Sequence, residues 1–455
     1  MLELFNRYII GATLPAALVA AGLYFWGALG FFPIAKFPRV AGALTRGGRG
    51  SLASLALSLA GTLGVGNIAG VAAAIFSGGF GAVFWMWVSA LVASVLKYAE
   101  ILLAMRHKVA SEAGFKGGAP YYIRAVCRKK YPRAAALLPS IFAVLFIANC
   151  LSMGALMQTE AIAGAFAEAC GMPSVLCGAV LAILTALLFA GGARGISRLA
   201  TALVPFMSLV YVALSLAVII PRAQRIPDLM REMISQAFSA DSAACGVMGF
   251  LLSRAVRFGV MRGLFSNEAG CGTSPTAHAS SGLNPCEQGF MGIAEVFIDT
   301  ILLCSLTAFS LMLSFENATA LGESPMGAVI SAYSSAFAPP FDGVVRIVMA
   351  FLVLCFGFAT ISCLSHYASE SLSFITKRRF AHRTLAAVYA FAVFLGAVIP
   401  PAPAWGISDL TVGCMTLINL WVLFVSRGEI IEETASYFKK SQNNCKIVKK
   451  FTKCS

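Results

Sequence analysis

Apolar segments long enough to cross a membrane recur along nearly the whole chain. Crossing about 30 Å of hydrocarbon takes about 20 helical residues, and charged residues, Pro and Gly divide the sequence into eleven such stretches. The predicted helices span residues 8–33, 51–77, 80–105, 135–166, 174–192, 199–220, 244–276, 288–315, 341–374, 384–400 and 406–426. The pattern therefore predicts an all-α polytopic membrane protein.

The composition supports this class. Of the 455 residues, 59% are hydrophobic and 12% are charged, a balance that a soluble protein could not bury. The 13 cysteines form no C-x-x-C pair and lie mostly in apolar stretches, so we interpret them as small core residues. The first apolar run is too long for a signal peptide and has no small-residue cleavage site, so we expect a retained helix.

The positive charge predicts an orientation. The formal net charge of +14 would suit a nucleic-acid partner, but Lys and Arg gather in alternate loops. With the N-terminus outside, the odd-numbered loops and the C-terminal tail lie on the opposite side of the membrane and together hold 25 Lys and Arg. The segments on the outside hold four. Because Lys and Arg favour the cytoplasmic side, we predict a multi-pass protein of the cell inner (plasma) membrane with a cytoplasmic C-terminus and no nucleic-acid partner. The oligomeric state stays open.

One leading helix and ten others suggest an inverted repeat of five plus five. The opening helix of each half contains a similar string, Asn67 to Gly70 and Asn267 to Gly270, with Gly64, Gly66 and Gly263 before them. The predicted units are an extra helix with a cytoplasmic loop (1–50), a first repeat (51–221), an extracellular connection (222–243), a second repeat (244–427) and a basic cytoplasmic tail (428–455).

The glycines around these strings indicate two broken helices that face each other near the membrane midplane. A break exposes amides on one half-helix and carbonyls on the other, which suits the carboxylate and ammonium of an amino acid. We expect the Gly64–Asn67 amides to receive the carboxylate, and carbonyls near Phe265 and Ser266 the ammonium. The alternative is that Gly66 and Gly70 merely allow close helix packing.

Ionisable residues inside predicted helices need an explanation, because burying a charge in a membrane is costly. Lys97 and Glu100 are spaced i, i+3 and are predicted to pair. Glu268 and Asp299 are candidate gating or structural residues, with Arg254, Arg257 or Arg262 as the expected partners. Glu160 is either a protonatable coupling group or a residue at the extracellular mouth.

No enzyme signature is present: the sequence lacks H-E-x-x-H, G-x-S-x-G and G-K-[ST]. Four scattered histidines suggest no metal cluster. We therefore expect no enzymatic activity, no cofactor and transport driven by an ion gradient.

Several motifs resemble the alanine or glycine:cation symporter family, also called sodium:alanine symporters. They cover nearly the whole chain and comprise Gly61–Val71, Gly81–Trp87, Lys97–Glu100, Gly117–Tyr122, Arg262–Gly270, Ala277–His278, Phe297–Thr300 and Trp405–Asp409. The resemblance implies a LeuT-type core after one extra helix, and uptake of an amino acid with sodium as co-substrate.

The resemblance also implies functional residues. The substrate set is Gly64, Gly66, Asn67, Gln158, Phe265, Ser266, Asn267 and Leu364. Sodium would be bound by the Thr360 hydroxyl and by the backbone carbonyls of Leu63 and Gly64.

Departures from the family pattern concern substrate and ion. Leu364 replaces a usual tryptophan and Ala359 a usual serine, while Glu160 stands where an asparagine is usual. We predict sodium-coupled import of a small neutral amino acid such as alanine, glycine or serine. The alternatives are proton coupling, a larger amino acid such as glutamine, or a non-transporting amino-acid sensor.

Overall fold

The computed structural model describes residues 11–46, 49–111, 114–238, 254–315 and 324–451. Within these ranges the chain is helical except for two short antiparallel strands, β1 (Val109–Ser111) and β2 (Gly114–Lys116). The predicted all-α character is therefore confirmed. The predicted boundary between residues 243 and 244 lies outside the described residues.

The helices of the first half precede residue 239. They are α2 (Gly11–Ala28), α3 (Phe32–Ala35), α4 (Phe37–Arg46), α5 (Arg49–Thr62), η2 (Val65–Asn67), α6 (Ala69–Gly78), α7 (Gly81–Arg106), α8 (Ala119–Lys130), α9 (Ala134–Asn149), η3 (Cys150–Leu156), α10 (Met157–Cys170), α11 (Ser174–Ile219), η4 (Ile220–Arg225) and α12 (Ile226–Ala237).

The helices of the second half follow residue 253. They are α15 (Arg254–Asn267), α16 (Pro275–His278), α17 (Pro285–Val296), η5 (Phe297–Cys304), α18 (Ser305–Ser314), α19 (Pro325–Ser334), α20 (Phe341–Ile375), α21 (Arg379–Gly396), α22 (Pro401–Val425) and α23 (Arg427–Phe451).

Length and composition mark six helices of the described chain as able to cross a membrane. They span Gly81–Arg106, Ala134–Cys170, Arg198–Ala237, Pro285–Ser314, Phe341–Ile375 and Ala402–Val425. Four shorter apolar helices, Thr13–Ala28, Leu52–Thr62, Ala69–Gly78 and Ser174–Phe189, accompany them. A multi-pass membrane protein is thus confirmed, while eleven spanning helices and the inverted repeat remain predictions.

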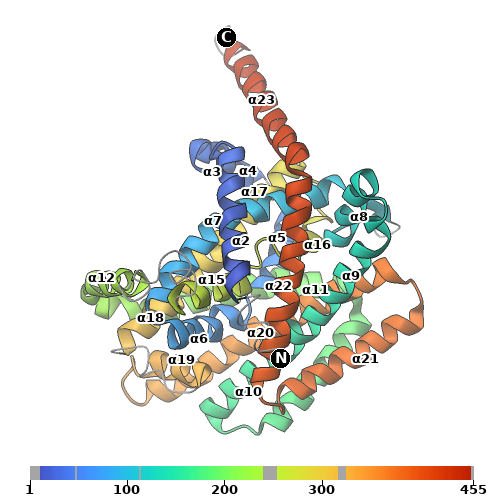
Figure 1. The fold of residues 1–455 in the computed structure, drawn as a ribbon. Helices are drawn as coiled ribbons and strands as arrows, with labels where there is room; N and C mark the ends of the chain where they lie inside the picture. The colour runs from blue at the N-terminus through green and yellow to red at the C-terminus, as the bar shows by residue number, and fades with distance from the viewer. Residues whose placement is uncertain (1–10, 47–48, 112–113, 239–253, 316–323, 452–455) are drawn as a thin grey trace.

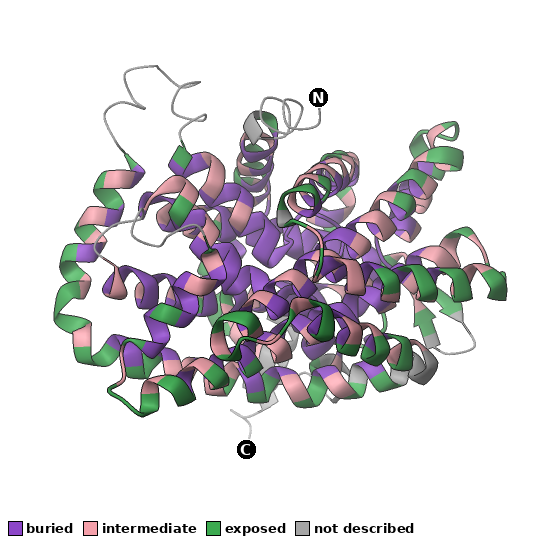
Figure 2. Ribbon diagram, turned by 90° about the horizontal axis from the view of Figure 1, so that it is seen from below, coloured by how far each residue is buried: buried purple, intermediate pink, exposed green. Residues whose placement is uncertain are grey.

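The helices pack around a buried centre, and exposed residues lie mainly on the outer helices (Figure 2). Helix α7 packs against α15 and α17, and α20 packs against α10 and α11. Leu209 on α11 is 71% exposed and Phe351 on α20 is 53% exposed. Exposed large apolar side chains on long apolar helices suit contact with lipid.

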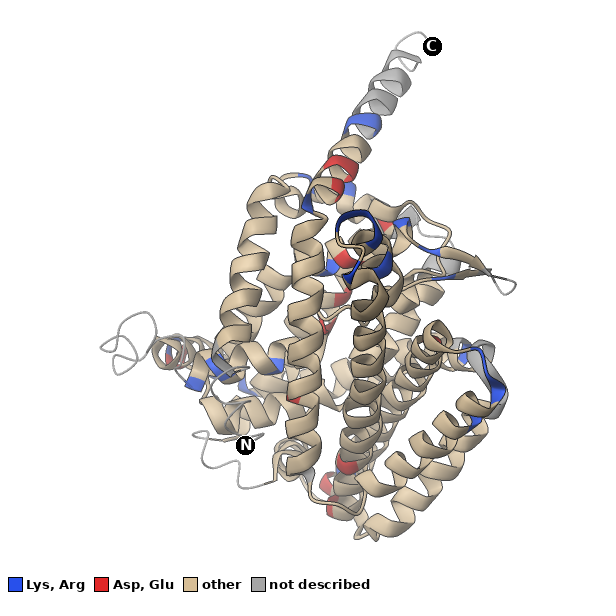
Figure 3. Ribbon diagram, turned by 45° about the vertical axis from the view of Figure 1, so that its right-hand side comes forward, with Lys and Arg blue, Asp and Glu red and all other residues tan. Residues whose placement is uncertain are grey.

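Helix α23 projects from the helical body, and Lys and Arg gather near its base (Figures 1 and 3). Its first turns are attached to the end of α7. The Arg106 Nε lies 2.6 Å from Glu429 Oε1, and Arg106 also pairs with Glu433.

One predicted boundary is absent from the structure. The sequence predicts separate helices at 174–192 and 199–220, whereas α11 runs unbroken from Ser174 to Ile219. The residues between the predicted helices include no proline, and Gly195 alone costs a helix only about 1 kcal/mol. A straight helix of 46 residues would be about 69 Å long, more than twice the hydrocarbon thickness.

Candidate functional site

The first predicted break is present and lies inside the protein. Helix α5 ends at Thr62 and α6 begins at Ala69, with only the short 3₁₀ turn η2 between them. A side-chain carbon added at Gly64 would lie 2.6 Å from Thr360 Oγ1 and 2.8 Å from Gln158 Oε1. Glycine at position 64 therefore allows two polar side chains to approach the interrupted backbone.

Gln158 on α10 and Thr360 on α20 satisfy backbone groups that the break releases. The Val65 N–H donates to Gln158 Oε1 over 3.0 Å. The Thr360 hydroxyl donates to the Ala60 carbonyl over 3.0 Å and lies 3.2 Å from the Phe356 carbonyl. The predicted substrate and ion residues thus meet at one place on the first break.

The second break begins directly after Asn267. Helix α15 ends there, Glu268 has the left-handed backbone angle φ 51°, and α16 begins at Pro275. The break predicted at the Asn267–Gly270 string is therefore present, directly after Asn267. Gly263 lies within α15, where it allows packing on α7, because an added carbon would lie 2.4 Å from Ser89 Oγ.

Asp299 in the π-helical segment η5 joins the two breaks. Its carboxylate accepts a hydrogen bond from Asn67 Nδ2 over 2.7 Å and from Ser266 Oγ over 2.7 Å. Thr300 Oγ1 donates to the same carboxylate over 2.8 Å and accepts from Asn267 Nδ2 over 3.0 Å. One buried acid thus fixes the relative position of both interrupted helices.

Lys97 pairs with Glu295 rather than with the predicted partner Glu100. Lys97 Nζ lies 3.1 Å from Glu295 Oε1 and donates to the Asn267 carbonyl over 2.8 Å. Both side chains are fully buried. The prediction failed because the Lys97 side chain extends to α17 and the second break. There it contacts the Glu295 carboxylate and the Asn267 carbonyl.

Glu295 connects further elements to this ion pair. Ser58 Oγ on α5 donates to its Oε2 over 2.8 Å, and His278 Nε2 on α16 lies 3.1 Å from the same oxygen. Ser274 Oγ donates to Oε1 over 3.1 Å. Glu295 and Lys97 therefore attach α5, before the first break, and α16, after the second break, to α17 and α7.

Glu100 and Glu268 are the other buried acids near the second break. Glu100 Oε2 accepts from the Gly272 N–H over 3.0 Å and from Asn419 Nδ2 over 2.8 Å. Glu268 accepts from the Thr273 hydroxyl, and its other oxygen has no hydrogen-bond partner among the described residues.

The expected arginine partners lie elsewhere. Arg262 is 3.5 Å from Asp409 and lies over the Trp405 ring, while Arg254 donates to the Ser77 carbonyl. The predicted pairing of Glu268 or Asp299 with these two arginines is therefore wrong. Hydroxyl and amide donors from the breaks approach the two acids closely instead.

Comparison with known proteins identifies the family. The model of the sodium:alanine symporter family matches residues 1–452. This chain belongs to the sodium:alanine symporter family. The chain is also 34% identical to an uncharacterized transporter of Haemophilus influenzae, with 98% of this chain and 97% of that one covered.

One further relative and one solved structure extend this comparison. The sodium/alanine symporter AgcS of Methanococcus maripaludis is 29% identical, with 97% of each chain covered. The solved structure of a Na⁺-coupled sialic acid symporter gives a TM-score of 0.55 at 15% identity and covers 93% of this chain and 87% of that chain. The LeuT-like fold and cation-coupled amino-acid transport are therefore confirmed.

Of the other predicted residues of this symporter, Phe265 lies beside the first break, whereas Leu364 and Glu160 have other surroundings. The Phe265 ring lies 5.1 Å from the Trp405 ring, and a carbon added at Gly66 would touch Phe265 at 3.4 Å. Leu364 packs instead against the backbone at Gly154 in η3. Glu160 is half-buried on α10, so its two interpretations both remain open.

Several residues of the symporter's buried hydrogen-bond network were not predicted from the sequence. The Ala60 carbonyl faces Thr360, and Thr307 Oγ1 donates to the Asn67 carbonyl over 2.6 Å. Glu295 had a detectable signal, because it precedes Asp299 by four residues and so shares a helix face with it. The contact of the Ala60 carbonyl had no sequence signal, since every residue has a backbone carbonyl.

Proposed function

We propose that this symporter imports a small neutral amino acid, such as alanine, glycine or serine, together with sodium. The main support is the meeting of two interrupted helices at Gln158, Thr360 and Asp299. Interrupted helices at the centre of a membrane protein provide backbone amides and carbonyls that bind charged groups.

The amino acid would lie between the two breaks. The amides of η2 would receive its carboxylate, in the place where Gln158 Oε1 now accepts from the Val65 N–H. The Phe265 and Ser266 carbonyls in the last turn of α15 would receive its ammonium, because the last carbonyls of a helix lack partners within the helix. Asn67 and Ser266 would be positioned for these contacts by Asp299.

Sodium would bind where Thr360 meets α5. A hydroxyl and backbone carbonyls are oxygen ligands of the kind that hard cations prefer. In the structure the Thr360 hydroxyl donates to the Ala60 carbonyl, so binding would rotate the hydroxyl proton away and direct both oxygens to the ion. The Leu63 and Gly64 carbonyls, at the start of the break, complete the proposed set.

Burial of the site supports alternating access. Asn67, Thr360 and Ser266 are each 0% exposed. A solute can therefore reach them only when helices move, and the broken helices would rock against the remaining scaffold.

Counterflow in proteoliposomes tests the proposal. Proteoliposomes that contain the purified protein are loaded with each common amino acid in turn. Those loaded with alanine, glycine or serine should show exchange in the presence of sodium and lose it in choline buffer. Exchange of glutamine but none of the three would assign the larger substrate. Uptake driven by a pH gradient without sodium would assign proton coupling, and ligand-dependent thermal stabilisation without flux would assign a sensor.

A further inference from the structure

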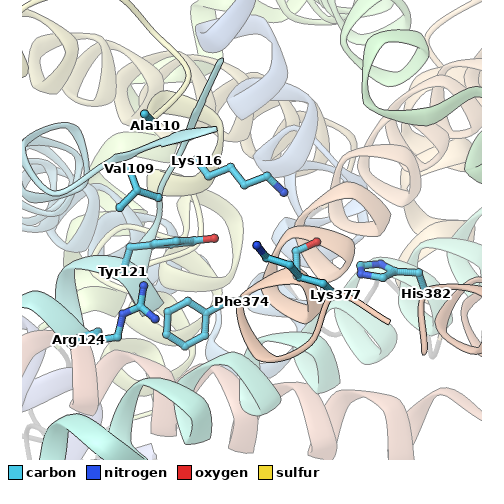
Figure 4. A pocket seen from close by; sticks show the side chains of 9 residues that line it. Val109, Ala110, Lys116, Tyr121, Arg124, Phe374, Lys377 and His382 are labelled. Atoms are coloured by element: carbon cyan, nitrogen blue, oxygen red, sulfur yellow. The ribbon is translucent and has the colours of Figure 1, made fainter. Parts of the chain in front are cut away.

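A basic cavity lies far from the two breaks, at the end of α20. Its volume is about 920 Å³, and its lining comes from β1, β2, α8, α20 and α21. The charged side chains that line it are Lys116, Arg124 and Lys377, with His382 beside them. Figure 4 shows Lys116 and Lys377 directed into the same space, with the Tyr121 hydroxyl facing them.

The cations of this cavity exceed the acids that neutralise them. Lys116 Nζ lies 3.3 Å from Glu370 Oε2. Among the described residues, Arg124 and Lys377 form no ion pair with a carboxylate. Like charges that face one cavity repel, and a bound anion relieves that repulsion.

Arg124 is held ready to bind. Its guanidinium lies 4.6 Å from the Phe374 ring centre and 5.7 Å from the Tyr121 ring centre. Contact with two aromatic rings restricts the motion of the guanidinium. A fixed guanidinium presents a planar set of donors that matches a phosphate group.

The cavity lies at the end of a helix that is long and apolar enough to cross a membrane. Helix α20 is one of the long apolar helices and ends at Ile375, between the lining residues Phe374 and Lys377. Exposed large apolar side chains lie next to the lining residues in the sequence: Phe380 is 80% exposed, Phe115 50% and Ile375 44%. Cations beside exposed apolar side chains match a phosphate headgroup above its acyl chains.

We propose that this cavity binds the phosphate group of an anionic phospholipid. Arg124 and Lys377 would contact the phosphate, Lys116 would add charge, and the acyl chains would lie along Phe380 and Ile375. The site is separate from the proposed amino-acid site and does not depend on its substrate.

Native mass spectrometry of the detergent-purified protein tests this site. Phosphatidylglycerol should give at least about threefold more bound lipid than phosphatidylcholine with the same acyl chains, and the variant Arg124→Gln/Lys377→Gln should remove the difference. The matched control is Arg379→Gln/Arg383→Gln, which removes the same charge from exposed residues that do not line the cavity. This control should retain the preference.

Three outcomes would overturn the proposal. They are equal binding of both lipids, an unchanged preference in the cavity variant, and an equal loss in the control variant. Displacement of the lipid by inorganic phosphate at low millimolar concentration would assign the site to a soluble anion instead. If the double variant does not fold, Lys377→Gln alone carries the test, because Lys377 is exposed.

Discussion

Gly64 occupies a position where any side chain would collide with both polar groups that face it. In Gly64→Ala, the added carbon would lie 2.6 Å from Thr360 Oγ1 and 2.8 Å from Gln158 Oε1. Forcing a methyl group into a packed site costs about 1–3 kcal/mol, so we expect sodium-dependent uptake to fall at least about tenfold. Initial uptake rates in proteoliposomes measure this effect.

The control is Gly70→Ala, in the same broken helix. No atom lies within 4 Å of a carbon added at Gly70, and alanine is the better helix former. Gly70→Ala should therefore keep uptake near the original rate. Equal loss in both variants would show that this helix, and not the approach of Thr360 and Gln158, limits transport.

Asp299 makes a second prediction at this scale. Asp299→Asn replaces one carboxylate oxygen by an amide N–H₂ that faces donors from Asn67, Ser266 or Thr300. Loss of a hydrogen bond to a charged acceptor costs about 1.5–3 kcal/mol, so uptake should fall at least about tenfold. The control is Asp228→Asn, on an exposed side chain, which should leave uptake unchanged. Unchanged uptake in Asp299→Asn would show that the Asp299 carboxylate does not position the breaks.

Among elements, the Lys97–Glu295 pair attaches parts of both broken helices to α7 and α17. Removing one partner of a buried ion pair costs about 3–5 kcal/mol, because the other charge stays buried without compensation. Lys97→Met should therefore lower the melting temperature more than Lys97→Met/Glu295→Gln does. Thermal unfolding in detergent measures the difference.

An exposed pair supplies the comparison for this experiment. Arg231→Met breaks a pair with Asp228 in which both side chains are more than three-quarters exposed, at 81% and 77%. Exposed pairs contribute about 0–1 kcal/mol, so its melting temperature should stay close to the original. A double variant less stable than Lys97→Met would contradict the assigned role of the buried pair.

The base of α23 predicts a dependence on pH. The neighbouring His107 imidazole and the Arg106 guanidinium lower the pKa of Glu429 to about 2. A carboxyl whose pKa falls on folding stabilises the protein above its unfolded pKa of about 4.3, and this stability disappears as pH falls toward 2. Because Glu429 is partly exposed, the contribution is below about 1 kcal/mol.

The variant Glu429→Gln isolates this contribution. Its melting temperature should lie below that of the original protein at pH 6, and the two values should converge as pH falls below about 4.3. A constant difference between pH 6 and pH 3 would show that the Glu429 charge does not attach α23. Glu432→Gln on the same helix serves as the control, since Arg106 pairs with Glu429 and Glu433.

For the whole molecule, the sequence predicted the features that depend on periodicity and composition. Apolar length predicted a helical membrane protein, and glycines around Asn67 predicted the first break. Partners across the bundle were less accessible: Lys97 was assigned to Glu100 by helical spacing, whereas the fold brings Glu295 to it. The Asn267–Gly270 string predicted the second break, but the role of Gly263 depended on tertiary contacts, because Gly263 serves packing on α7.

Membrane orientation is the last prediction. Lys and Arg place the N-terminus outside, the C-terminus in the cytoplasm and the middle of α11 on the cytoplasmic side. Exposed Arg198 lies in that middle region, and Arg231 on α12 is 81% exposed. In a background with exposed Cys170 and also Cys245, Cys445 and Cys454 replaced by serine, cysteine at 231 should react with a membrane-impermeant maleimide in whole cells, and cysteine at 198 only in inside-out vesicles.

This labelling also decides how α11 is arranged in the bilayer. If α11 contains two spans, position 198 lies at a cytoplasmic turn and reacts from that side, as the two basic residues Arg194 and Arg198 predict. A buried position 198 that reacts from neither side would instead place the middle of α11 within the membrane. In that case residues 199–220 would not form a separate span.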